Sequence, residues 1–267
     1  MNYAVLGCGR MGSSLIRGML CSGITSGDRI TVTSKNPEEA LVAASNLGAK
    51  SATTNAEAIS EAGIVFLCVK PTQALGVIRD ISSDLSDKLV ISVVAGIRSS
   101  DIFHAAGGKA RIIRSMPNTA VRLRKGVIAI SPHASATPAD LEISRRIFSS
   151  VGSVHEVNEE ALDTVTAVSG SGPAFALLML EALAQGAVDG GVSPELATTF
   201  AAGALSAAST LVTETGESPL ALRAQITSPG GTTEAGLRVL DHADFSSVVR
   251  DAVQAARKRS IELSEKP

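Results

Sequence analysis

AVLGCGRMG, residues 4–12, opens the chain with a short apolar run that leads directly into a glycine-rich loop. The loop has the spacing G-x-G-x-x-G and is followed by a helical pattern over residues 13–21. Gly7 permits a tight turn, Gly9 lets a pyrophosphate approach the backbone, and Gly12 lets the helix pack closely on the strand. This order of strand, loop and helix predicts a Rossmann-type dinucleotide site. The loop residues expected to contact the cofactor are Gly7, Cys8, Gly9, Arg10, Met11 and Gly12.

The second predicted strand, residues 29–33, ends without the acidic residue that would hold the ribose 2′-hydroxyl of NAD. Ser34 and Lys35 stand there instead. A hydroxyl and a cation suit a 2′-phosphate, because they attract the charge that a carboxylate would repel. NADPH is therefore the expected cofactor, with NADH as the weaker alternative. The competing interpretation is that Lys35 is an ordinary solvated loop lysine.

Alternating helices and strands continue this pattern. Helices are predicted over residues 37–47 and 138–149 and from Asn55, which is expected to cap its own helix; strands are predicted over residues 50–52, 64–69, 89–94, 112–115, 127–130 and 153–156. Ligands of open α/β sheets bind beyond the carboxyl ends of the strands. The residues at these ends that are expected to face one crevice are Val69, Lys70, Pro71, Ala95, Gly96, Met116, Pro117 and Asn118.

The composition changes at about residue 158, where Ala, Leu, Gly, Ser and Thr begin to dominate at helical spacing. The expected fold class is α/β: a doubly wound NADP-binding Rossmann domain over residues 1–157, followed by an all-helical substrate-binding and dimerisation domain over residues 158–267. Predicted helices such as residues 175–188 and 195–213 are apolar around too much of their circumference for an isolated bundle. A homodimer through this domain is therefore expected.

Charge and composition restrict the class of partner. The formal net charge is −2 and aromatic residues make up 3% of the chain, so nucleic acid is not an expected partner. The longest uninterrupted apolar stretches are strand-length and the chain enters its first strand without a signal peptide, so a cytoplasmic protein without a membrane span is expected. The three cysteines, Cys8, Cys21 and Cys68, lack metal-ligand spacing and are expected to be small buried hydrophobes; no metal site is predicted.

A second motif lies in LRAQITSPGGTTEAGLRVLD, residues 222–241, where a Pro-Gly-Gly turn and two threonines separate two helical patterns. Glycines there would leave the backbone bare and free to adopt positive φ, and the following helix would point unpaired amides into the turn. Such a turn is suited to a small carboxylate, although it could equally be a plain helix-loop-helix corner. The residues expected to form this cradle are Ser228, Gly230, Gly231, Thr232 and Thr233.

The residues available for acid–base chemistry narrow the reaction type. The only tyrosine lies in the first strand, the four histidines (His104, His133, His155 and His242) fall in no motif, and no lysine occurs between Lys125 and Lys258. A carbonyl reductase, which must protonate an alkoxide, is therefore disfavoured. Reduction of an imine fits better, because the protonated iminium is already electrophilic and a hydroxyl near its nitrogen could suffice.

These residues resemble the pyrroline-5-carboxylate reductase family over essentially the full length. The resemblance rests on the glycine loop, Val69-Lys70-Pro71, Met116-Pro117-Asn118, Ser169-Gly170-Ser171-Gly172-Pro173-Ala174, and Thr227-Ser228-Pro229-Gly230-Gly231-Thr232-Thr233 followed by Ala235-Gly236-Leu237. It implies NADPH-dependent reduction of 1-pyrroline-5-carboxylate to L-proline by homodimers, often gathered into decamers. The chain departs from the family pattern at Phe175, where tyrosine is expected, and at Ala224, where an acidic residue is common.

The resemblance also implies roles for single residues. Ser34 and Lys35 would meet the 2′-phosphate. Asn55 and the Val69-Lys70-Pro71 segment would contact ribose and nicotinamide, and Ala95 would border the cofactor. Thr233 would be the catalytic hydroxyl beside the imine nitrogen. Two alternatives stay open at this point: another NADP-dependent reductase of the β-hydroxyacid dehydrogenase type, whose second-domain lysine is missing here, and a non-catalytic NADP-binding sensor.

Overall fold

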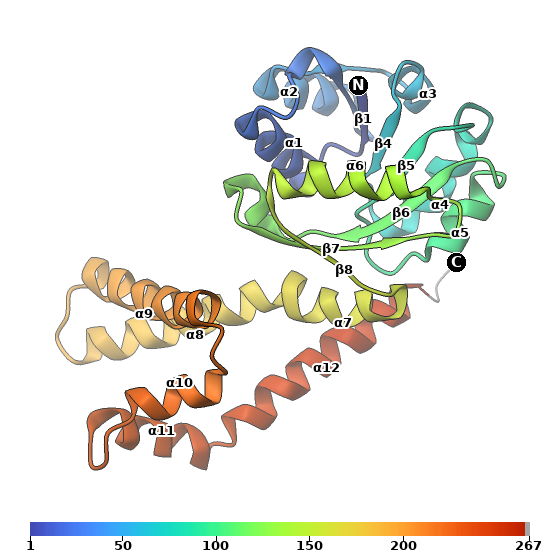
Figure 1. Cartoon of the computed structure of the whole chain (residues 1–267). Helices are drawn as coiled ribbons and strands as arrows, with labels where there is room; N and C mark the ends of the chain where they lie inside the picture. The colour runs from blue at the N-terminus through green and yellow to red at the C-terminus, as the bar shows by residue number, and fades with distance from the viewer. Residues whose placement is uncertain (265–267) are drawn as a thin grey trace. The chain divides into compact units, whose positions relative to one another are not determined.

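A mixed sheet, mostly of parallel strands, is the frame of the N-terminal part of the chain (Figure 1). The computed structural model describes residues 1–264, and their strands follow the order β3-β2-β1-β4-β5-β6-β7-β8. Their bounds are β1 (Tyr3–Leu6), β2 (Ile30–Thr33), β3 (Lys50–Ser51), β4 (Ile64–Leu67), β5 (Leu89–Ser92), β6 (Arg111–Met116), β7 (Gly126–Pro132) and β8 (Gly152–Glu156). The order of the first six strands is that of a Rossmann fold, which confirms the predicted fold class.

Strand direction changes once in this sheet. β7 pairs antiparallel with β6, whereas every other neighbouring pair, including β7 with β8, is parallel. The strand order reverses between β1 and β4, which neighbour each other and both lead into loops at their carboxyl ends. This reversal is the switch point at which open α/β sheets bind ligands.

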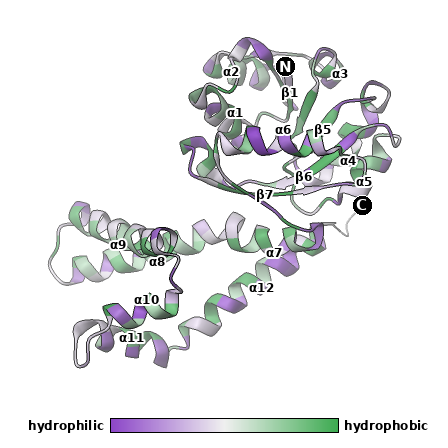
Figure 2. Cartoon of the chain, in the orientation of Figure 1, coloured by the Kyte–Doolittle hydropathy of each residue, from purple (hydrophilic) through white to green (hydrophobic). Residues whose placement is uncertain are grey.

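Helices cover both faces of the sheet. They are α1 (Arg10–Ser22), α2 (Pro37–Leu47), α3 (Asn55–Ile59), α4 (Pro71–Asp80), α5 (Ser99–Ala105) and α6 (Pro138–Ser149). Helices α1, α2 and α6 pack on one face with side chains such as Val5 and Phe66, and α3, α4 and α5 pack on the other with Leu6 and Val65. Successive residues of the central strands β1, β4 and β5 therefore point to opposite faces and are buried on both, as is typical of parallel strands. Figure 2 shows the apolar residues gathered in these strands.

Local sequence accounts for most helix boundaries. Pro37 and Pro138 begin their helices at the predicted residues, because proline needs no intrahelical partner in the first turn. Thr137 and Asp140 form a reciprocal capping box on α6. The prediction for α3 was wrong in one respect: Thr54, and not Asn55, caps the helix, by accepting a hydrogen bond from the Glu57 amide at 3.1 Å. Strands β4 and β5 are also shorter than predicted, and each ends two residues early.

The remaining residues are mainly helical: α7 (Leu162–Val165), a π-helical turn (Thr166–Ser171), α8 (Gly172–Asp189), α9 (Pro194–Thr215), α10 (Pro219–Ile226), α11 (Thr232–His242) and α12 (Phe245–Ser264), with short 3₁₀ turns at Gly27–Arg29, Ser82–Asp84, Thr119–Leu123 and Glu159–Ala161.

Contacts divide the chain into two units. The first comprises Met1–Gly170 and the chain from Ala256 onward, and the second is Ser171–Ala255. The sequence boundary expected at residue 157 falls within the first unit.

The second unit has little core of its own. Helices α8 and α9 pack along each other, yet α8 has no buried residue among those described and α9 has only Ala197 and Ala201. Large apolar side chains face outward, including Leu178 at 67% and Phe200 at 63% exposure. By length and composition alone, the described helical stretches Glu159–Asp189 and Pro194–Thr215 could cross a membrane. These two helices are longer than the strand-length apolar runs of the first unit, so the absence of a membrane span stays a prediction.

Candidate active site

The glycine loop has the geometry that its spacing predicts. Gly7 has φ +90°, and a Cβ there would lie 2.8 Å from Val69 Cγ1 and 2.9 Å from the Cys68 carbonyl, so only glycine fits. A Cβ on Gly12 would meet the Gly7 carbonyl oxygen at 2.8 Å, which shows how closely α1 approaches β1. A Cβ on Gly9 would meet nothing within 4 Å, so the backbone is bare on that side. The loop is thus tight where it packs and open where a ligand would approach.

The amides at this loop divide into three groups, of which one is the Gly9 amide, which donates to the Gly7 carbonyl oxygen at 2.8 Å. Those of Gly7 and Cys8 donate to the Thr33 carbonyl oxygen at 3.1 and 2.8 Å and fix the loop to the end of β2. Helix α1 then starts at Arg10 without a side-chain cap, so its first-turn amides point outward with no intrahelical acceptor. A helix N-terminus of this kind favours an anion such as a pyrophosphate.

A cavity of about 660 Å³ opens beside the loop. Six of the predicted cofactor residues line it: Gly7, Gly9, Ser34, Lys35, Val69 and Lys70. They come from the ends of β1, β2 and β4, so the switch point and the cavity coincide. The cavity is also lined by residues that were not predicted, Asn36, Pro37, Glu39, Cys68 and Gln73.

Glu39 is the most consequential of the residues that sequence reasoning missed. Its carboxylate accepts a hydrogen bond from the Ser34 hydroxyl at 3.1 Å, at the place where a 2′-phosphate is expected. Both Glu39 and Lys35 are exposed, so the carboxylate is free to swing away. Its position in the first turn of α2, directly after the loop, is the signal that could have found it. The site therefore carries one cation and one carboxylate around Ser34.

The other predicted cofactor residues do not line this cavity. Asn55 lies beside the end of β2, where its Oδ1 accepts a hydrogen bond from Thr33 Oγ1 at 2.7 Å. Asn118 Oδ1 accepts from the amides of Ala120 and Val127 at 3.3 and 3.4 Å, so its amide group holds the turn after β6. The predicted residues outside the cavity lining are Cys8, Arg10, Met11, Gly12, Asn55, Pro71, Ala95, Gly96, Met116, Pro117 and Asn118.

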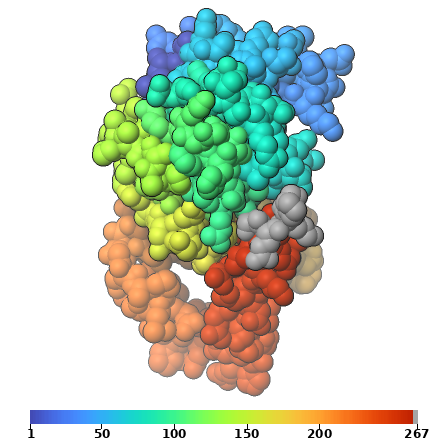
Figure 3. Space-filling view, turned by 90° about the vertical axis from the view of Figure 1, so that its right-hand side faces the viewer, coloured from blue at the N-terminus to red at the C-terminus, as the bar shows by residue number. Residues whose placement is uncertain are grey.

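The end of β5 meets the C-terminal helix. Gly96 has φ +76°, and a Cβ there would lie 3.0 Å from Leu263 Cβ and 3.1 Å from the Ser260 carbonyl oxygen. Figure 3 shows the last turns of α12, in red, against the green segments of the first unit. The side of Gly96 that a side chain would occupy is therefore filled by protein.

A buried ion-pair cluster holds this end of the unit together. Arg114 on β6 is 4% exposed and pairs with Glu159 at 3.2 Å and with Asp163 at 3.8 Å. Ser99 donates to Glu159 through its amide at 2.7 Å and its hydroxyl at 2.6 Å, and Ser260 donates to Asp163 at 2.7 Å. Burial raises the pKa of Glu159, but the bonds from Ser99 and the charge of Arg114 outweigh it and leave the pKa lowered.

The cysteines of the site favour their neutral form. Cys8 is buried, and burial raises the pKa of its thiol. Burial and the neighbouring Cys8 raise the pKa of the Cys68 thiol further. Cys21 is exposed and Cys68 is half-buried, so the expectation that all three cysteines are buried holds only for Cys8. Within residues 1–264, no cluster of three or more His, Cys, Asp or Glu side chains is placed to hold a metal ion.

The predicted carboxylate cradle is a turn of the second unit. Gly230 has φ +72°, as predicted, whereas Gly231 has φ −81° and serves as the N-cap of α11. A Cβ on Gly231 would lie 2.6 Å from Ser228 Oγ and 3.0 Å from the Ser228 carbonyl oxygen, so a side chain there would displace the serine hydroxyl. Helix α11 starts at Thr232 without a side-chain cap, so the first-turn amides of Thr232 and Thr233 have no intrahelical acceptor.

The cradle already binds a carboxylate from its own chain. Glu234 Oε2 accepts a hydrogen bond from the Gly230 amide at 2.6 Å. This contact was not predicted, although Glu234 comes directly after the two threonines. It indicates that the turn directs at least one amide outward in a geometry that a carboxylate oxygen can meet.

Comparison with known proteins covers both parts of the chain. The family model for pyrroline-5-carboxylate reductase dimerisation matches residues 159–263, and the model for NADP oxidoreductase, coenzyme F420-dependent, matches residues 2–96. A pyrroline-5-carboxylate reductase of Arabidopsis thaliana is 36% identical over 97% of this chain and 94% of its own length. The chain belongs to the pyrroline-5-carboxylate reductase family. A second member, from Escherichia coli, is 35% identical over 97% of each chain.

Solved structures agree with this family. The crystal structure of Plasmodium falciparum pyrroline carboxylate reductase with NADP bound superposes with a TM-score of 0.92 at 28% identity, and covers 99% of this chain and 98% of its own. The agreement extends over the glycine-loop domain and the helical part alike. The family relationship predicted from the glycine loop and the Ser228–Thr233 motif is confirmed.

Proposed function

We propose that the chain reduces 1-pyrroline-5-carboxylate to L-proline with NADPH, the last step of proline biosynthesis. The observation that carries the proposal is identity of 35–36% to two pyrroline-5-carboxylate reductases over 97% of the chain. The fit of the residues to the reaction supports it, since one unit carries an anion-binding glycine loop and the other an anion-binding turn.

The cofactor's phosphates match the donors of the first unit. The bare backbone at Gly9 and the first-turn amides of α1 would hold the pyrophosphate, and Ser34 with Lys35 would hold the 2′-phosphate. NADPH supplies a hydride. The remaining predicted contacts to ribose and nicotinamide, from Asn55 and from the ends of β4, β5 and β6, stay part of the proposal.

The substrate's carboxylate matches the donors of the second unit. The amides of Thr232 and Thr233, with the Ser228 hydroxyl, would hold it at the start of α11. The Gly231 amide, which was also predicted to contribute, already donates to the Ser228 carbonyl oxygen at 3.0 Å. The bond between Gly230 and Glu234 supports this role, because it places a carboxylate oxygen on the same turn. Holding the carboxylate fixes the ring, so positioning would contribute most of the acceleration.

Thr233 would orient the imine nitrogen through its hydroxyl. A threonine hydroxyl is a poor acid, so the proton on the product nitrogen would come from the substrate's own iminium form or from water. Hydride addition to the protonated iminium then gives the neutral secondary amine of proline and oxidised cofactor, with atoms and charges balanced. The residue's role is to align the electrophile, and not to supply the proton.

We further infer a cytoplasmic homodimer formed through the helical unit, and assembly into decamers as a further step. The scarcity of buried side chains in α8 and α9 supports a partner, because so apolar a surface is rarely left in water. The match to the family's dimerisation model supports the same surface. Light scattering coupled to size exclusion tests this: a dimer or a multiple of dimers is expected, and a monomer at micromolar concentration would contradict it.

The reaction is tested by following NADPH absorbance with purified protein at saturating 1-pyrroline-5-carboxylate, with NADH and an acyclic keto acid in parallel. Oxidation with the cyclic imine, faster with NADPH than with NADH, is expected. Binding of NADPH without turnover of any cyclic imine would favour a non-catalytic sensor. Oxidation with the keto acid would instead favour a reductase of the β-hydroxyacid type.

A further inference from the structure

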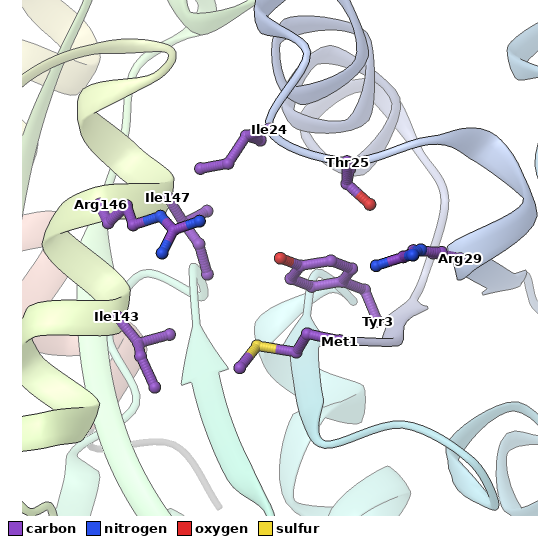
Figure 4. A pocket seen from close by; sticks show the side chains of 8 residues that line it. All are labelled: Met1, Tyr3, Ile24, Thr25, Arg29, Ile143, Arg146 and Ile147. Carbon is purple, nitrogen blue, oxygen red and sulfur yellow. The ribbon is translucent and has the colours of Figure 1, made fainter.

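A small pocket lies at the end of the sheet opposite to the glycine loop. Tyr3 is the first residue of β1, whose other end leads into Gly7, and Arg29 directly precedes β2. Helix α6 contributes Ile143, Arg146 and Ile147. The cavity measures about 140 Å³, which is room for four or five water molecules at about 30 Å³ each. Figure 4 shows the lining side chains around it.

The hydroxyl of Tyr3 has no hydrogen-bond partner among the described residues. Tyr3 is 6% exposed, and its ring stacks on Phe66 with centroids 6.4 Å apart. Within residues 1–264, its hydroxyl takes part in no hydrogen bond, and it is not among the buried atoms that lack a partner, so the oxygen is accessible from the pocket. The hydroxyl lies at the wall of the pocket, where a bound molecule could pair with it (Figure 4).

Two guanidinium groups line the same pocket, and Figure 4 shows the Tyr3 hydroxyl pointing to the side of Arg146, with Arg29 on the other side of the ring. Burial raises the pKa of Tyr3, while the charges of Arg146 and Arg29 lower it in part, so both cations act on the phenol oxygen. In the described part of the chain neither side chain forms an ion pair or a hydrogen bond. The adjacent Arg145, by contrast, pairs with Glu156.

Asp28, the residue before Arg29, forms no ion pair with these cations in the described part of the chain. Asp28 is exposed, and a hydrogen bond from Ser26 is the largest cause of its lowered pKa, with Arg29 a smaller one. The Thr25 hydroxyl, also in the wall, already donates a long bond of 3.4 Å to the Ser26 carbonyl oxygen. The pocket thus presents two positive charges and one free hydroxyl.

The rest of the wall is apolar and consists of Met1 and three isoleucines. Ile24, Ile143 and Ile147 face the cavity from α6 and from the segment after α1 (Figure 4). Such a surface contributes to binding only when an apolar group covers it, by about 25 cal/mol for each Å² removed from water. A fully hydrophilic anion would leave these side chains without a partner.

We propose that this pocket binds a small aliphatic carboxylate, held by Arg29, Arg146 and the Tyr3 hydroxyl, with its hydrocarbon part against the three isoleucines. Guanidinium groups match the planar carboxylate and can donate two parallel hydrogen bonds to it. A free amino acid fits less well, because its ammonium group would lie close to two cations. The site is separate from the cavity at the glycine loop and does not depend on the proposed reaction.

The composition of the chain provides a selective probe. Tyr3 is the only tyrosine and there is no tryptophan, so near-ultraviolet fluorescence reports on this pocket and not on the cradle at α11. The experiment titrates the full-length protein with isovalerate, with valine, which is the same skeleton carrying an ammonium group, and with inorganic phosphate. We expect a saturable change in tyrosine fluorescence with isovalerate, at lower concentration than with valine or phosphate.

Variants assign the effect to the two arginines. Arg29→Gln and Arg146→Gln should each raise the Kd for isovalerate about tenfold, because each removes a charge-assisted hydrogen bond. Arg145→Gln is the matched control on the same helix and should leave the Kd unchanged, and circular dichroism checks that every variant is folded. Tyr3→Phe removes the fluorophore, so its weaker binding is measured by calorimetry.

Three results would overturn the proposal. The first is no saturable fluorescence change with isovalerate at its highest soluble concentration. The second is equal or tighter binding of valine or phosphate. The third is an unchanged Kd in a folded Arg29→Gln, Arg146→Gln double variant.

Discussion

Lys35 gives the sharpest test of cofactor choice, because its proposed partner, the 2′-phosphate, is present in NADPH and absent from NADH. Lys35→Gln keeps a polar side chain of similar length and removes the charge. A charge-assisted hydrogen bond contributes about 1.5–3 kcal/mol. Lys35 is exposed, so the lower part of that range applies, since solvent and salt screen the pair. About 1.5–2 kcal/mol corresponds to a loss of roughly 10- to 30-fold in kcat/KM with NADPH.

The assay compares kcat/KM for NADPH and NADH in the wild type and in the variant. The NADPH value should fall while the NADH value stays within about twofold, and the difference should shrink as ionic strength rises. Glu39→Gln is the opposing variant. It removes the carboxylate that accepts from Ser34 and should raise kcat/KM for NADPH a few-fold, because a like charge beside the phosphate is lost. Equal losses with both cofactors in Lys35→Gln would refute the assignment of Lys35 to the 2′-phosphate.

Three further predictions concern catalysis and stability. Thr233→Ala should lower kcat about tenfold without abolishing it, since one neutral hydrogen bond is lost, and Thr233→Ser should restore most of the activity; a fully active alanine variant would exclude Thr233. Phe66→Ala should lower the free energy of unfolding, measured in urea, by about 3–5 kcal/mol, because Phe66 is fully buried. Leu41→Ala, at an exposed position, should change the free energy of unfolding by less than about 0.5 kcal/mol, and similar values for both variants would contradict the described core. Glu159 has a lowered pKa in the folded state, so its ionised form stabilises the fold; this stabilisation is complete above the ordinary pKa of 4.5 and is lost as the pH falls through the lower pKa of the folded state. Glu159→Gln should therefore make the free energy of unfolding depend less on pH in that range. An unchanged pH dependence in acid would show that other carboxyl groups dominate.

Local sequence signals predicted much of this fold. The spacing of Gly7, Gly9 and Gly12 is read from consecutive residues and located the loop correctly, although the contacts that exclude a side chain at Gly7 come from the distant Cys68 and Val69. Both ends of helix α2 can be predicted from single residues, because Pro37 begins the helix and Gly48, with φ +62°, ends it. Such features depend on a few consecutive residues, which is why they can be recognised without a structure.

Features that depend on distant residues were missed. The antiparallel direction of β7 is determined by its pairing with β6, and residues 126–132 alone do not specify it. Two adjacent residues, Thr54 and Asn55, could each cap α3, and the bond from Thr33 to Asn55 decides between them across 22 residues. The contact of Ser260 with Asp163 spans 97 residues and has no local signal.

The candidate site shows the same division. Ser34 and Lys35 were predicted from their position directly after the second strand, and both line the cavity. Glu39 and Glu234 were not, because an acidic residue in the first turn of a helix is ordinary and becomes informative only when its carboxylate is seen on Ser34 or on the Gly230 amide. The close approach of Gly231 to Ser228 Oγ was likewise hidden, since it depends on the turn being closed.

The central claim is hydride transfer from NADPH to the imine carbon, and isotope transfer tests it most directly. The protein is incubated with NADPH deuterated at the transferred position and with 1-pyrroline-5-carboxylate, and the product is analysed by mass spectrometry and NMR. The account predicts L-proline with one deuterium on the carbon that was the imine carbon. Proline without deuterium, or oxidised cofactor without proline, would contradict it.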